Sequence, residues 1–277
     1  MKSLLLLLFV VASVNLFGQT QDSVWKHSVV AGLNLTQVGF TDWAQGGENA
    51  LAWTLGLDGR SSIDATLWNW DNAYKFAFGQ TRLSSQGLRK TDDKNDLSSV
   101  LTYKMGTYIN PYASATFKSQ FATGFKYDDL GNAAALSKFF DPGYFTQSAG
   151  FGYQPVPEAK VRLGVALREI FTSTYTQYTD DPSTKDIETR KTDGGLEFVT
   201  DVNWPLMENI LFTSKIEMFD PFKTLDVIVV RGDNTIAARV NKYVVVSFNV
   251  QFINEKEITP RTQLKEALSM GLTYSLF

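Results

Sequence analysis

The sequence predicts an all-β protein, a closed antiparallel transmembrane β-barrel of about twelve strands. Three observations predict it. The chain opens with Lys2 and an apolar run over residues 4–12, many later segments alternate apolar and polar side chains, and residues 271–277 alternate again and end on Phe277. An export signal followed by long alternating strands is typical of a bacterial outer-membrane barrel.

The first 18 residues are expected to be a cleaved signal peptide. Lys2 supplies its positive charge, and the apolar run is too short to cross a bilayer as a helix. Gly18 marks the preferred cleavage point and Ala12 a weaker one. The chain has no cysteine, which excludes a lipid-anchored N-terminus, disulfides and thiolate metal sites. We therefore expect residues 19–277 to form the barrel, exported to the outer membrane.

Alternation at period two separates a lipid-facing side from a lumen side on each strand. Trp53, Leu55 and Leu57 share one face, whereas Asp58 and Arg60 share the other. In a membrane barrel the apolar face meets lipid and the polar face lines the lumen. The side chains predicted to face lipid include Trp53, Trp68, Trp70, Tyr74, Phe76, Phe78, Phe248, Phe252, Leu272, Tyr274 and Leu276.

Strand segments follow one another along the chain with alternating short and long connections. The long connections are expected at 81–94, 126–143 and 172–192, and an even strand count places both termini on the periplasmic, short-turn side. Residues 231–234 are read as either a bulge or a separate turn. The predicted strands are 26–38, 50–63, 67–80, 95–106, 108–125, 144–154, 158–171, 193–204, 208–219, 224–239, 242–253 and 262–277.

A secreted β-sandwich is the main alternative fold, because its strands would also alternate. It explains the segments of ten or more residues poorly, since strands usually have about 5–6 residues. It also gives no reason for charged residues to lie so regularly opposite aromatic ones, or for the terminal Phe277.

Composition and motifs exclude several classes of function. The 26 basic and 29 acidic residues form no basic block, so no nucleic-acid partner is expected. The single histidine, His27, begins the first strand, and no Gly-x-Ser-x-Gly motif occurs, so we expect no enzyme and no cofactor. The expected partners are outer-membrane lipid and lipopolysaccharide, the barrel-assembly machinery during biogenesis, and other outer-membrane proteins.

Short motifs in order along most of the chain carry a family resemblance. They are residues 34–38, 41–49, 70–72, 89–93, 117–121 with Gly124, 136–144 and 271–274. They resemble an uncharacterised family of Bacteroidota outer-membrane proteins, domain of unknown function 3078. Asp42 and Ser119 stand where that family usually has Asn and Thr. The resemblance implies an outer-membrane barrel and brings no known activity.

Two polar segments allow more than one interpretation. The predicted mouth loop is Asp42, Trp43, Gly46, Gly47, Glu48 and Asn49. It is either a rim turn with Trp43 in the aromatic girdle, or an ordered element that narrows the lumen or presents a recognition surface. Residues 89–96 are either an internally paired surface loop or a contact for carbohydrate, cation or lipopolysaccharide.

The polar strand faces are the second candidate site. Two functions remain open: a narrow channel or transport-related barrel for small polar solutes, or a non-conducting structural or accessory barrel of a larger outer-membrane assembly. The charges either line a small pore, well below the size of porins with 16–18 strands, or fill the lumen as an ion-pair network. The predicted lumen residues are Asp58, Arg60, Asp71, Lys75, Lys104, Lys118, Arg162, Arg168, Glu197, Asp201, Lys215, Glu217, Arg239 and Lys265.

Overall fold

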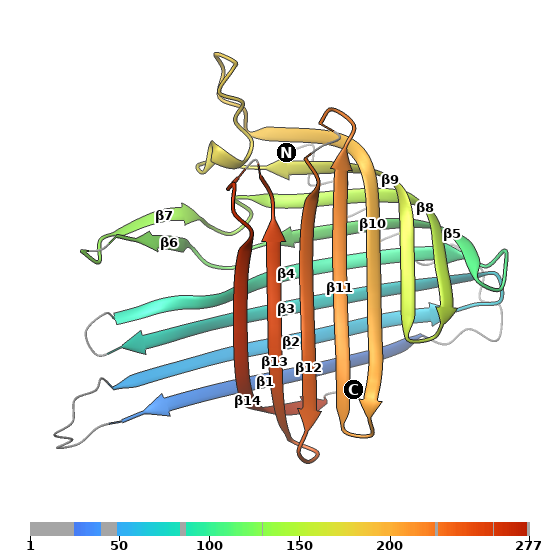
Figure 1. The fold of residues 1–277 in the computed structure, drawn as a ribbon, viewed down its shortest axis with the longest axis horizontal. Coiled ribbons are helices and arrows are strands. Elements are labelled where there is room, and N and C mark those ends of the chain that lie inside the picture. The colour runs from blue at the N-terminus through green and yellow to red at the C-terminus, as the bar shows by residue number, and fades with distance from the viewer. Residues whose placement is uncertain are drawn as a thin grey trace.

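Twelve strands close into one antiparallel barrel in the computed structural model (Figure 1). The structure describes residues 25–39, 49–83, 87–128, 130–224, 227–256 and 258–275. Each barrel strand pairs with the next in sequence, except that β5 pairs with β8 past a separate hairpin, and β1 pairs with β14 to close the barrel. The predicted fold class is confirmed. No helix in the described ranges is long and apolar enough to cross a bilayer.

The barrel strands match the predicted segments closely at most boundaries. They are β1 Lys26–Val38, β2 Ala50–Asp64, β3 Trp68–Leu83, β4 Gly87–Tyr103, β5 Ile109–Ser119, β8 Gly143–Val156, β9 Ala159–Phe171, β10 Arg190–Met207, β11 Ile210–Pro221, β12 Val229–Arg239, β13 Val244–Asn254 and β14 Gln263–Ser275. The additional hairpin is β6 Gly124–Tyr127 with β7 Ala133–Ser137, and a short 3-10 helix, η2, spans Thr176–Tyr178.

The two ends of the barrel differ in their connections. At one end, here the short-turn end, the connections are 65–67, 104–108, 157–158, 208–209 and 240–243. At the other, here the long-loop end, they are 39–49, 84–86, 120–142, 172–189, 222–228 and 255–262. β1 begins and β14 ends at the short-turn end, where Val30 pairs with Ser275.

Two sequence predictions about connections were wrong. Residues 81–94 are not a long loop, because β3 continues to Leu83, which pairs with Gly87 at the start of β4, and Gly87 has a positive φ of 69°. Residues 231–234 are neither a bulge nor a turn, because β12 pairs with β11 and β13 without a register shift. In both segments, charged residues that suggested a loop are paired with distant strands instead.

The outer wall of the barrel is apolar. Along β14 the exposed side chains alternate with half-buried ones, and Leu268 is 76% exposed. Leu272, Tyr274 and Phe248 are also exposed, whereas Leu276 lies outside the described residues. Soluble proteins place apolar side chains inside and charged ones outside. This barrel has the opposite arrangement, which is typical of a membrane-spanning barrel.

Aromatic side chains mark both edges of this outer wall. Near the short-turn end, His27 stacks on Trp25 with ring centroids 6.0 Å apart, and Trp25 also contacts Trp70 at 5.7 Å. Towards the long-loop end, Phe117 near the end of β5 stacks on Phe140 with ring centroids 5.6 Å apart. Rings at both rims are the arrangement expected where a barrel meets the two membrane surfaces.

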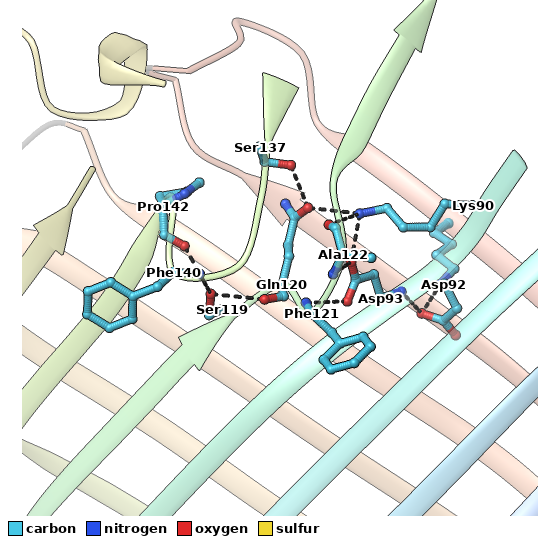
Figure 2. Close-up of polar contacts among 11 residues, drawn as sticks. Lys90, Asp92, Asp93, Ser119, Gln120, Phe121, Ala122, Ser137, Phe140 and Pro142 are labelled. Carbon is cyan, nitrogen blue, oxygen red and sulfur yellow. Dashed lines mark hydrogen bonds and ion pairs between the residues drawn. The ribbon is translucent and has the colours of Figure 1, made fainter. Parts of the chain in front are cut away.

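A polar cluster holds the base of the β6–β7 hairpin against β4 (Figure 2). Asp93 accepts hydrogen bonds from the backbone N–H groups of Phe121 (2.6 Å) and Ala122 (3.0 Å). Lys90 Nζ donates to Asp93 (2.7 Å) and to Gln120 Oε1 (3.0 Å). Lys90 and Asp93 are thus paired with each other, but within a strand and not in the loop that the sequence suggested, whereas Asp92 pairs with Lys265 on β14.

Candidate functional site

A large cavity occupies the lumen from the short-turn end inwards. Its volume is about 620 Å³, and its wall includes Pro157 and Glu158 of the β8–β9 turn at one extreme and Arg231 and Asp233 of β12 at the other. Charged side chains of both signs line it. Those named in the sequence prediction are Asp58, Arg60, Asp71, Lys75, Lys118, Arg162, Asp201, Lys215 and Glu217.

Ion pairs cross the lumen at the inner end of this cavity. Lys118 on β5 pairs with Glu217 on β11, which also pairs with Lys215 at 2.9 Å. Lys94 on β4 reaches Asp233 on the opposite wall, β12, at 2.5 Å. The pairs Lys118–Glu217 and Lys94–Asp233 join strands that are not neighbours. They are here called the struts, because they connect the walls of the barrel across its interior.

A second group of side chains, here called the seal, lies beyond these struts towards the long-loop end. It consists of Tyr144, Arg168, Phe219, Arg231 and Glu255. Glu255, the first residue of the β13–β14 connection, is 2% exposed and pairs with Arg168 and, at 2.8 Å, with Arg231. Burial opposes the charge of Glu255, but the two arginines outweigh it and lower the pKa of Glu255 to about 2.

Aromatic rings hold the arginines of the seal in place. Arg231 lies over the ring of Tyr144 at 4.8 Å, and Arg168 lies 5.5 Å from Tyr144 and 5.8 Å from Phe219. The cavity beside this group has a volume of only about 50 Å³ and is lined by Arg168, Glu197 and other residues. That space suffices for a few waters and not for a solute.

The start of the long β9–β10 connection is held against the β7–β8 connection, at the long-loop end. Asp141, which is almost completely buried, accepts hydrogen bonds from the backbone N–H groups of Ser173 (3.0 Å) and Thr174 (2.8 Å). Thr172 and Thr179 are buried and their hydroxyl groups lie 2.6 Å apart. These contacts hold the first turn of the connection against the long-loop end of the barrel.

Three further predicted lumen residues lie away from both cavities. Lys265 on β14 pairs with Asp92 on β4 at 2.7 Å, between strands that are not neighbours. Lys104 lies at the short-turn rim, where it pairs with Asp64 at 2.6 Å. Arg239 is exposed at the end of β12, where its backbone N–H donates to Asn209 O at 2.7 Å. Arg168 and Glu197 line the small cavity.

The predicted mouth loop is not placed by the structure. Asp42, Trp43, Gly46, Gly47 and Glu48 lie outside the described residues, and Asn49 is described only as the exposed residue before β2. Its order and its role at the mouth stay predictions.

Several lumen residues were not predicted from the sequence, for identifiable reasons. Lys94 and Asp92 were assigned to a loop, and Arg231 to a bulge or turn, so period two was not applied to them. Lys160 has the same parity as Arg162 on β9, so alternation could have found it. Glu255 follows the last residue of β13, and no strand periodicity marks a connection residue.

Part of the chain matches a known family model. The model is described as "Protein of unknown function (DUF3078)", and it matches residues 35–125. The family resemblance is confirmed over that range, which contains most of the motifs that suggested it, whereas residues 136–144 and 271–274 lie outside the match. The assignment of these proteins to Bacteroidota stays a prediction. No curated protein matches the chain.

Several solved barrels are similar in overall fold. The translocator domain of the autotransporter NalP from Neisseria meningitidis is 10% identical, covers 99% of this chain and 94% of its own, and has a TM-score of 0.38. An outer-membrane channel from Pseudomonas putida F1 is 11% identical, with coverages of 94% and 98% and a TM-score of 0.40. The NanC porin is 6% identical, with coverages of 90% and 97% and a TM-score of 0.35.

Proposed function

We propose that the protein is a bacterial outer-membrane barrel whose lumen is a narrow path for small polar solutes, closed in the present conformation. One observation carries the proposal: the cavity of about 620 Å³ enters from the short-turn end and stops at the ion pairs around Lys118, Glu217 and Arg231. A polar cavity lined by charges of both signs suits small charged or zwitterionic solutes.

The proposal includes the orientation and biogenesis of the barrel. Residues 1–18 direct export and are cleaved, the short-turn end with both termini faces the periplasm, and the barrel-assembly machinery inserts the chain. The apolar outer wall supports a membrane location, and the short turns at one end support this orientation, since outer-membrane barrels have short periplasmic turns.

A second function is favoured by the same struts. The charges of Lys118, Glu217, Lys94 and Asp233 neutralise one another across the lumen, as they would in a non-conducting barrel that acts as an accessory of a larger outer-membrane assembly. In that case the outer surface and the connections, including residues 41–49, would bind the other proteins of the assembly.

Planar-bilayer recording separates the two functions. The purified wild-type barrel is expected to show little or no steady conductance. Removing the strut and the seal together without changing the net charge, by Lys118→Ala and Glu217→Ala with Arg168→Ala and Glu255→Ala, is expected to open discrete conductance, because the strut ends the large cavity and the seal lies beyond it. The matched control removes the seal with the Lys265–Asp92 pair instead, by Lys265→Ala and Asp92→Ala with Arg168→Ala and Glu255→Ala, because that cross-lumen pair does not line the large cavity.

Folding of each variant is checked first by heat-modifiable migration in detergent gels. If the variant that lacks both the strut and the seal is folded and as silent as the wild type, the path does not exist and the accessory barrel is the better account. If the control pair opens the same conductance, the pair at Lys118 is not the specific closure.

A further inference from the structure

Positive side chains from two walls gather in the short-turn half of the large cavity. Arg60 on β2, with Lys160 and Arg162 on β9, all line it. The charged groups that act most strongly on Lys160 are Asp71, Arg162, Asp201 and Arg60, so side chains from both walls influence one another across the lumen. This group is separate from the struts and the seal further inside.

The group carries one positive charge more than its acids balance. Arg60 pairs with Asp71, and Arg162 pairs with Asp201 at 3.3 Å. Lys160 then has no ion-pair partner within 4.0 Å among the residues that the structure describes. A lysine that lines a cavity of this size without a fixed counter-ion is free to take a mobile one.

The wall of the large cavity as a whole carries an excess of one positive charge, because eight basic and seven acidic side chains line it. Asp58 and Glu158 are among these acids, but neither forms an ion pair with Lys160 within 4.0 Å. On the inner side, the single carboxylate of Glu217 is shared by Lys118 and Lys215.

Arg162 has hydrogen-bonding capacity that the protein does not use. It is 6% exposed, its Nη2 donates to Asp201, and its guanidinium lies 5.5 Å from the ring of Tyr112. Its buried Nε has no acceptor among the described residues. A buried donor without a partner is unfavourable. Arg162 also lines the cavity, where the planar N–H groups of a guanidinium match the paired oxygens of a carboxylate or phosphate.

We propose that Arg60, Lys160 and Arg162 form a binding subsite for small oxyanions, either carboxylates or phosphates, that enter from the short-turn end. The cavity has room for such a solute, since binding sites for small molecules typically occupy about 300–1,000 Å³. Lys160 supplies the unbalanced charge, Arg162 supplies directional hydrogen-bond donors, and Arg60 supplies a further positive charge nearer the solvent. This inference rests on the proposed function, because it names the solute class of the same lumen.

Direct binding tests the subsite without requiring conductance. Isothermal titration of the detergent-purified mature barrel uses inorganic phosphate in one series and succinate in another. Lys160→Gln removes the unpaired charge without breaking an ion pair and is expected to weaken binding at least about tenfold, a difference that a lost charge-assisted contact produces. Arg162→Lys keeps the charge but loses the paired N–H donors of the guanidinium, and is expected to weaken binding as well.

The matched control is Lys185→Gln, which removes one positive charge from the exposed β9–β10 connection. It is expected to bind both probes as the wild type does. Binding of phosphate alone or of succinate alone identifies which oxyanion the subsite accepts. Equal binding by the wild type, Lys160→Gln and Arg162→Lys, or no binding of either probe by the wild type, overturns the subsite.

Comparison with bilayer recordings separates this inference from the proposed function. If oxyanion binding depends on Lys160 but no variant conducts, the subsite is supported and the proposed path is overturned. If the variant without the strut conducts but the barrel binds no oxyanion, the path is supported and the subsite is overturned.

Discussion

Each end of the lumen contains an ion pair between an arginine and a carboxylate, but the two pairs lie in different surroundings. At the long-loop end Glu255 is 2% exposed and lies between two arginines that are packed on aromatic rings. At the short-turn end the side chain of Arg60 is 58% exposed where it pairs with Asp71. The comparison teaches that an arginine–carboxylate pair is buried among aromatic rings at one end and solvated at the other, so breaking it should cost much more stability at the long-loop end.

The largest expected effect comes from removing the acid of the seal. Glu255→Ala leaves Arg168 and Arg231 side by side without their counter-ion, and should lower the free energy of unfolding by about 3–5 kcal/mol. The same change at the open end, Asp71→Ala, should cost only about 0–1 kcal/mol, because its partner Arg60 is largely solvated. Urea unfolding followed by tryptophan fluorescence measures both. Equal losses would show that the two ends do not differ in solvation.

A second prediction contrasts the lumen with the outer wall on a single strand. Phe76→Arg places a charge on the lipid-facing side of β3 and should cost about 2–4 kcal/mol if it lies near the bilayer midplane. Ala77→Arg, one residue further, points to the polar lumen and should cost clearly less. Folding titrations into lipid vesicles compare the two. A larger loss for the Ala77 variant would mean that the faces are assigned the wrong way round.

These contrasts also show what could be predicted from the sequence. Period two located the twelve strands, because each strand meets lipid on one side and a polar lumen on the other. The period-two pattern failed where a charged residue has its ion-pair partner on a distant strand. Lys94 was assigned to a loop, but it lies on β4 and pairs with Asp233 on the opposite wall. The seal depends on Glu255, a connection residue whose role comes only from the closed barrel.

The pH dependence of the seal is a smaller effect with a defined sign. The pKa of Glu255 is lowered from 4.5 to about 2, so its contribution to stability is present above pH 4.5 and is lost as the pH falls towards about 2. The stability difference between the wild type and Glu255→Gln should therefore be constant from pH 7 to 5 and shrink below pH 4.5. A difference that persists unchanged to pH 2 would show that the charge of Glu255 is not what stabilises the seal.

Cysteine labelling tests most directly whether the lumen is open at one end and closed beyond the struts. The natural chain has no cysteine, so single cysteines can be introduced without background. Thr213 lines the large cavity and Thr146 lines the small cavity beside the seal. With a small water-soluble maleimide, Thr213→Cys is expected to react readily and Thr146→Cys to stay protected until the barrel is unfolded. Equal, rapid labelling of both folded variants would contradict the account, because it would show that the lumen is not sealed.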